Sequence, residues 1–275
     1  MARLGGDFPK RAAAGVVMMA AALGSAWAGG AIFAVFWAAA ALGVLWEWQS
    51  LVAREQRLPR FAGGVLLFAA LGAIAFWRAP AGWALGAGAG LLAGAVSIGL
   101  GKAGRVVSPL WHWGGVLYAL ALAASVMILR GSRTHGLEAI LWLFAVVWGT
   151  DIFAYFGGRL VGGKKLWPRV SPGKTWSGFV VGVCSGGVIG ALVAPSSSAW
   201  GWILPFSLAA AAMSQGGDLF ESALKRRFGA KDSGKLIPGH GGVMDRLDGF
   251  IAASAFAAFV AATRAPLDNL AAGLF

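Results

Sequence analysis

Composition, the length of the apolar runs and the placement of basic residues predict an all-α, polytopic integral membrane protein with about nine transmembrane helices. Of 275 residues, 58% are hydrophobic and 12% are charged, whereas a soluble domain is usually about 45–50% apolar and about 25% charged. Glycine, which is frequent in membrane helices, occurs 43 times. The apolar runs are too long to be the alternating strands of a barrel, so we expect these runs to be helices.

Nine apolar runs approach the length of about 20 residues that a helix needs to cross a hydrocarbon core about 30 Å thick. Breaks that contain glycine or proline separate several of them. The expected spans are residues 12–28, 31–48, 61–77, 82–100, 111–129, 137–156, 176–194, 200–216 and 249–265. We divide the chain into N-terminal membrane helices, 1–110, and a C-terminal membrane region, 111–275, which carries two polar loops at about 157–175 and 217–248.

Basic residues lie mainly on alternate segments of this layout. If the N-terminus is cytoplasmic, 19 of the 23 Lys and Arg fall on inner segments, and the four exceptions are Arg78, Arg130, Arg133 and Arg264. This is the positive-inside distribution. It predicts a multi-pass protein of the cell inner (cytoplasmic) membrane, with both polar loops facing the cytoplasm. The same orientation explains the net charge of +12, so we expect no nucleic-acid partner.

The first apolar run has a second interpretation. Lys10-Arg11 before it and Ala26-Trp27-Ala28 at its end are typical of a cleaved signal peptide. We favour an uncleaved first helix because another apolar run follows at once.

Acidic residues are scarce, and five of the eleven lie within one stretch of 31 residues. They are Asp218, Glu221, Asp232, Asp245 and Asp248. If the eighth helix continues through 216–228 and the ninth begins near Val243, helical spacing places these carboxylates on the facing sides of two helix ends. Carboxylates brought together repel one another unless a cation lies between them. Oxygen ligands suit Mg²⁺, which one or two carboxylates plus substrate phosphates typically hold.

Salt bridges are the structural alternative for this cluster, and spacing alone leaves both interpretations open. A sixth acidic residue, Asp151, lies inside an apolar run. An Asp at the centre of a bilayer costs about 2.5–3.5 kcal/mol on insertion scales. We therefore expect Asp151 to face a functional cavity, or else to pair with Arg159 or a lysine.

Cations accompany these carboxylates in both polar loops. Ser171-Pro172-Gly173-Lys174-Thr175 is expected to form a compact turn before a helix, where N–H groups and Lys174 could bind a phosphate. Lys225-Arg226-Arg227 and Lys231 lie within the acidic cluster. Carboxylates that hold a metal and cations that neutralise phosphates are what a metal–triphosphate site needs. His240, in a glycine-rich turn, could donate to a phosphate or be incidental.

The stretch 222–248 resembles the long C-terminal signature of the phosphatidate cytidylyltransferase family. Here it reads Ser222-Ala-Leu-Lys225-Arg226, then Lys231-Asp232-Ser-Gly-Lys-Leu-Ile-Pro-Gly-His240-Gly-Gly-Val-Met-Asp245-Arg246-Leu-Asp248, with every family position filled. Asp151, Gly158-Arg159 and Ser171 to Trp176 also look like the family. Ser177 departs from it, because an acidic or amide residue is expected there.

The resemblance implies a Mg²⁺-dependent enzyme, often dimeric, that converts CTP and phosphatidic acid at the bilayer to CDP-diacylglycerol and pyrophosphate. It places the metal on Asp218 and Asp245, with Asp232 and Asp248 as second candidates and room for a second cation. The catalytic residues expected on this basis are Lys225, Lys231, Asp232, His240 and Arg246. The expected substrate-binding residues are Asp151, Arg159, Ser171, Lys174, Thr175, Ser222, Arg226 and Asp248.

Three other functions remain as alternatives. A polyprenol or phytol kinase shares the pattern from Asp151 to Lys174 but lacks the long signature. A CDP-alcohol phosphotransferase would carry a D-G-x-x-A-R pattern, which is missing here. A transporter or channel would suit Asp151 and the glycine-rich helices, but its charged residues belong near the midplane rather than in a cytoplasmic loop.

Overall fold

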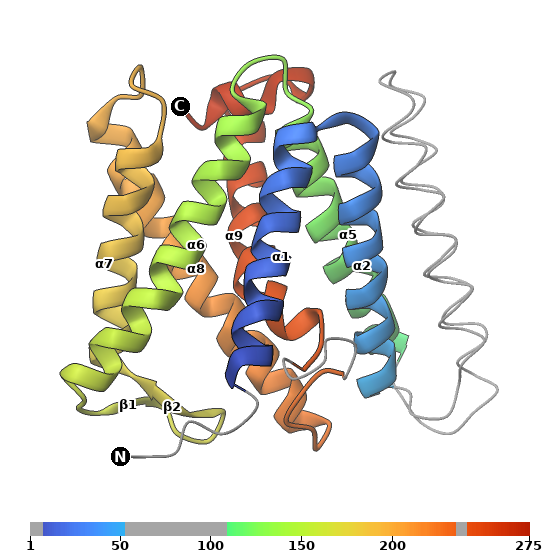
Figure 1. Ribbon diagram of the computed structural model, residues 1–275, viewed down its shortest axis with the longest axis vertical. Helices are drawn as coiled ribbons and strands as arrows, with labels where there is room; N and C mark the ends of the chain where they lie inside the picture. Colours follow the sequence, from blue (N-terminus) through green and yellow to red (C-terminus); the bar gives the residue numbers. More distant parts are fainter. Residues whose placement is uncertain (1–7, 53–108, 235–240) are drawn as a thin grey trace.

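The computed structural model describes residues 8–52, 109–234 and 241–275, and most of these residues are helical. The elements are α1 (Phe8–Ala28), α2 (Gly30–Val52), α5 (Pro109–Arg130), α6 (Gly136–Leu160), β1 (Lys165–Trp167), β2 (Ser171–Thr175), α7 (Trp176–Val193), α8 (Trp200–Arg227), α9 (Met244–Ala262) and the 3₁₀ helix η1 (Leu267–Gly273). The long helices form a bundle in which successive helices run in opposite directions (Figure 1).

The expected spans agree with these helices wherever the structure describes them. Seven of the nine fall on α1, α2 and α5 to α9, whereas 61–77 and 82–100 lie outside the described residues. In the described part, α2, α6 and α7 are long and apolar enough to cross a membrane. A fourth span is added if α9 and η1, bent by 104°, count as one. The fold class is therefore confirmed as helical with membrane-capable helices, but the count of nine is not.

The all-α prediction was wrong for the segment between α6 and α7, which contains two short strands. β1 and β2 form a small antiparallel hairpin in which Lys165 pairs with Thr175 and Trp167 with Ser171. This segment is short and polar, so its backbone groups are satisfied by pairing with each other rather than in a helix. The compact turn expected at 171–175 is thus a strand, and α7 begins directly after it.

The helices on either side of this hairpin, α6 and α7, pack closely against each other. A Cβ atom at Gly182 of α7 would lie 2.8 Å from the Thr150 carbonyl oxygen of α6, so only glycine allows the two helices to approach this closely. In the centre of the bundle, the Trp37 ring of α2 stacks on Phe250 of α9, with ring centroids 5.0 Å apart. The helices that carry polar residues are therefore held by a packed apolar core.

Several helix ends that carry polar residues lie at the same end of the bundle. The hairpin, the C-terminal ends of α2, α6 and α8, and the start of α9 are all found there (Figure 1). α8 continues to Arg227 and α9 starts at Met244. The prediction that carboxylates at these two helix ends face each other depends on both boundaries. The two polar loops expected on one side of the membrane thus lie on one side of the molecule.

Candidate active site

A polar cavity of about 340 Å³ lies among α6, α8 and α9 at this end of the bundle. Six acidic and two basic side chains line it: Asp151, Asp218, Glu221, Lys225, Asp232, Asp245, Arg246 and Asp248. The structure therefore brings all the predicted carboxylates together, from segments nearly 100 residues apart in the sequence.

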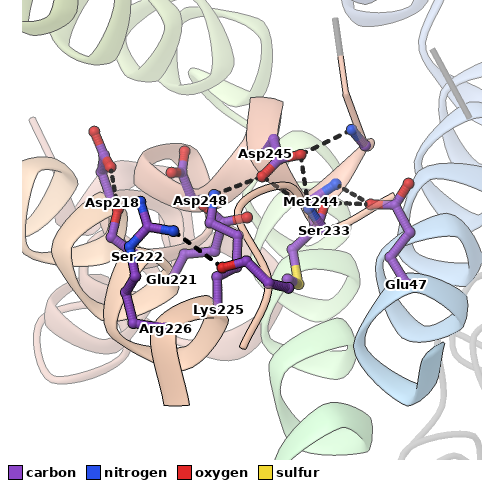
Figure 2. Close-up of polar contacts among 12 residues, drawn as sticks. Glu47, Asp218, Glu221, Ser222, Lys225, Arg226, Ser233, Met244, Asp245 and Asp248 are labelled. Atoms are coloured by element: carbon purple, nitrogen blue, oxygen red, sulfur yellow. Dashed lines mark hydrogen bonds and ion pairs between the residues drawn. The ribbon is translucent and has the colours of Figure 1, made fainter. Parts of the chain in front are cut away.

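Lys225 connects α8 and α9, two of the three helices around the cavity. Its ammonium nitrogen lies 2.9 Å from Glu221 Oε2 on its own helix and 2.6 Å from Asp245 Oδ1 on α9 (Figure 2). Glu221 and Lys225 both lie on α8 after the expected membrane span 200–216, and therefore outside it. Burial lowers the pKa of Lys225, but its contacts with Asp245 and Glu221 outweigh this effect and raise the pKa above its ordinary value. Lys225 is thus a charged group fixed between two carboxylates.

Asp245 also binds the loop that precedes α9. Its Oδ2 accepts hydrogen bonds from the backbone N–H of Gly242 at 2.8 Å and of Ser233 at 3.0 Å. Gly241 beside it has a φ of +82°, a conformation that glycine adopts without strain. Asp245 therefore binds both ends of the stretch 233–242, called the signature loop below, and it also binds Lys225.

Lys174 brings the hairpin to the cavity. Its ammonium lies 2.6 Å from Asp218 Oδ2 and 3.3 Å from Gln215 Oε1, both on α8. Ser222 Oγ donates to the other Asp218 oxygen at 3.4 Å. The two predicted metal carboxylates, Asp218 and Asp245, thus each hold a lysine.

Asp151 lies within α6, which continues to Leu160. It lines the cavity, whereas Arg159 donates instead to the Tyr155 hydroxyl at 2.6 Å. Asp151 is therefore a cavity residue that does not pair with Arg159, and the alternative of pairing with a lysine stays open.

Three further predicted residues that the structure describes are not among those that line the cavity. Ser171 lies on β2, Arg226 is exposed and donates to the Ala230 carbonyl at 3.0 Å, and Lys231 is exposed in the loop. His240 lies outside the described residues. Their roles stay predictions.

The start of α7 is less open to a phosphate than the sequence suggested. Thr175 is the N-cap of α7, and its side chain accepts a hydrogen bond from the Gly178 N–H at 3.1 Å. The Trp176 N–H donates to the Lys164 carbonyl. Two of the N–H groups at this helix start are therefore already bonded, and Lys174 is the group that reaches the cavity.

The donor set of the cavity suits a cation such as Mg²⁺. Burial raises the pKa of Glu221 to about 7, although Lys225 lowers it, and Glu221 Oε1 is buried without a hydrogen bond from any described residue. A further positive charge beside Glu221 would therefore be stabilising. Among the described residues, no three His, Cys, Asp or Glu side chains are already placed to ligate one ion.

The sequence interpretation missed one buried carboxylate next to this site. Glu47 of α2 is only 1% exposed, and it accepts hydrogen bonds from the loop that carries the signature. A signal was present: Glu47 lies within the predicted span 31–48, and an ionisable residue inside a membrane span suggests a functional site. Because Glu47 is far in sequence from the other acidic residues, it was not grouped with them.

Comparison with known proteins supports an enzymatic site. A model described as the cytidylyltransferase family matches residues 9–263. A phosphatidate cytidylyltransferase of Brucella abortus is 43% identical over 259 residues, which are 90% of this chain and 91% of that protein. The protein of that name from Brucella suis is 44% identical over 239 residues, 83% of this chain and 84% of its own. The one from Staphylococcus saprophyticus is 45% identical over 134 residues, 46% of this chain and 49% of its own. The signature, the acidic cavity and these matches together show that the chain belongs to the cytidylyltransferase family.

Proposed function

We propose that the protein is a phosphatidate cytidylyltransferase, which transfers CMP from CTP to phosphatidic acid and forms CDP-diacylglycerol and pyrophosphate for phospholipid biosynthesis. The names of relatives that match most of the chain support this activity. The observation that carries it is the cavity at the end of an apolar bundle, in which six carboxylates and two cations meet. Such a site suits a water-soluble, metal-bound triphosphate that reacts with a lipid headgroup.

The reaction requires neutralisation of charge more than proton transfer. An anionic oxygen of phosphatidate attacks the α-phosphorus of CTP, the new P–O bond forms, and the bond to the β-phosphate oxygen breaks to release pyrophosphate. Because the nucleophile is already ionised, no strong general base is needed. Lys225 and Arg246 in the cavity and Lys174 beside it would stabilise the negative charge of both reactants.

The charge balance of the cavity supports a role for Mg²⁺. With three times as many acidic as basic side chains lining it, the substrate-free cavity would repel a triphosphate. Asp218 and Asp245 are the proposed ligands, and Asp232 and Asp248, which line the same cavity, are second candidates. A bound Mg²⁺ would supply positive charge to the phosphates and the leaving group. Lys174 and Lys225, now paired with these carboxylates, would then be freed to contact phosphate oxygens.

We also propose that the cavity faces the cytoplasm in the inner membrane and that the protein is a homodimer. The distribution of basic residues supports the orientation, and the hairpin, the end of α8 and the start of α9 lie at one end of the bundle (Figure 1). The dimer rests on the family resemblance, and the mass of the detergent-solubilised protein would test it.

A direct assay tests the proposed function. Purified protein in detergent should release pyrophosphate when phosphatidate, CTP and Mg²⁺ are all present. Chelation with EDTA should stop the release, and excess Mg²⁺ should restore it. Release that continues in EDTA would show that the reaction does not need the metal. Release without phosphatidate would show that phosphatidate is not the acceptor.

A further inference from the structure

We infer that Glu47 is a positioning residue for the active site, although it lies in the N-terminal membrane helices, 1–110, and not in the C-terminal region that carries the two polar loops. It acts on the site through Ser233 and the first turn of α9. The inference extends the proposed function, because it concerns how the carboxylates of that site are held in place.

Three hydrogen bonds join Glu47 to both ends of the signature loop (Figure 2). Glu47 Oε2 accepts from Ser233 Oγ and from the Met244 N–H, each at 2.8 Å. Glu47 Oε1 accepts from the Val243 N–H at 2.9 Å. These are normal hydrogen-bond lengths, and the side chain is almost fully buried. One carboxylate from α2 thus fixes the chain before and after residues 234–242.

Glu47 also satisfies the start of α9. The first N–H groups of a helix have no partner within the helix, and Val243, the N-cap residue, makes no side-chain cap of its own. Glu47 supplies two acceptors there from another helix. Its negative charge is favourable at this position because the N-terminus of a helix carries partial positive charge.

Ser233 connects Glu47 to the cavity. Its hydroxyl donates to Glu47, and its backbone N–H donates to Asp245, which in turn contacts Lys225. A change at Glu47 therefore reaches Asp245 by two routes, through Ser233 and through the first turn of α9.

Two glycines of the signature are needed because the loop passes so close to Glu47. A Cβ atom at Gly234 would lie 2.5 Å from Glu47 Oε1, and one at Gly242 would overlap both Glu47 Oε2 and Ser233 Oγ. At Gly234 and Gly242 the group approached is the carboxylate of Glu47.

The test compares Glu47→Gln with Ser50→Ala, a control on the same helix. Ser50 Oγ bonds only to the Trp46 carbonyl of its own helix among the described residues. Glutamine keeps the shape of Glu47, but its NH₂ group must face an N–H or O–H donor. We expect kcat for CDP-diacylglycerol formation to fall by about 10- to 100-fold, as for other small displacements of reacting groups, with little change in KM for CTP. Ser50→Ala should stay close to wild type.

Hydrogen exchange of the substrate-free protein gives a readout that does not depend on activity. Peptides that cover 231–249 should exchange faster in Glu47→Gln, whereas peptides from α6 and α7 should not change. If the wild type proves inactive but this faster exchange is seen, the proposed function fails and the anchoring by Glu47 stands. If the wild type is active and Glu47→Gln changes neither kcat nor exchange, the inference is wrong. A fall in kcat without faster exchange also contradicts it, because the effect would then not pass through α9.

Ser233→Ala keeps the inference testable if Glu47→Gln does not fold. It removes the hydroxyl that bonds to Glu47 and leaves the N–H that bonds to Asp245. We expect a smaller fall in kcat and faster exchange in the same peptides. In the double variant the two losses should not add, because both remove one shared contact. Wild-type kcat and exchange in Ser233→Ala, or fully additive losses, would overturn the link through Ser233.

Discussion

Replacing Asp245 by Asn tests the charged core of the site most severely. Asp245 contacts the Lys225 ammonium at 2.6 Å through Oδ1, and its Oδ2 accepts from the N–H groups of Ser233 and Gly242. Asparagine has one acceptor oxygen in place of two, so its NH₂ group must face either the ammonium or the two N–H donors. At least one of these contacts becomes repulsive, and the charge that holds Lys225 is lost.

The contacts set the size of the effect. A hydrogen bond to a charged group contributes about 1.5–3 kcal/mol, and about 1.36 kcal/mol corresponds to a tenfold change in rate. Losing the contact with Lys225 alone therefore predicts a kcat about 10- to 100-fold lower. If Asp245 also holds Mg²⁺, the loss should be larger, and the Mg²⁺ concentration needed for half-maximal activity should rise.

Formation of CDP-diacylglycerol by purified Asp245→Asn, measured across a Mg²⁺ titration, gives both quantities. Asp268→Asn is the matched control, because Asp268 is 54% exposed and forms a surface ion pair with Arg133. Such pairs contribute about 0–1 kcal/mol, so this control should remain active. Turnover near that of the wild type in Asp245→Asn would refute the role given to this carboxylate.

Three further predictions concern the rest of the site. Lys174→Ala should raise KM for CTP by at least about tenfold, since a charged contact to phosphate is lost, and steady-state kinetics would show an unchanged KM if the assignment is wrong. Gly242→Ala should lower both activity and thermal stability, because its Cβ would overlap buried polar atoms; a melting curve like that of the wild type would contradict the close approach. In a Cys184→Ala background, an impermeant thiol reagent should label Ser197→Cys but not Arg169→Cys in intact cells, and the reverse pattern would overturn the orientation.

Helix positions could be predicted well because apolar run length is a property of the local sequence. The expected span 176–194 differs from α7 (Trp176–Val193) by a single residue. The hairpin at 165–175 could not be predicted in the same way. Its strands are only three and five residues long, and their stability comes from pairing and from the contact of Lys174 with α8, neither of which leaves a periodic pattern.

The carboxylates of the cavity could be predicted where helical spacing connects them. Asp218 and Glu221 are one turn apart on α8, and Asp245 and Asp248 are one turn apart on α9. Glu47 could not be placed, because its contact with Ser233 spans 186 residues and depends on how α2 packs against α9. The ion pair that Asp218 makes with Lys174 was likewise not foreseen, since spacing shows which residues share a helix face but not which helix faces them.

The position of the transferred label tests the central claim most directly. Purified protein is incubated with phosphatidate and CTP that carries ³²P at either the α- or the γ-phosphate, and the lipid fraction is then counted. Cytidylyl transfer predicts that the α-label enters the lipid while the γ-label leaves as pyrophosphate, because the bond between the α-phosphorus and the β-phosphate oxygen is broken. Lipid labelled from the γ-phosphate, with CDP as the other product, would show a kinase and contradict the account.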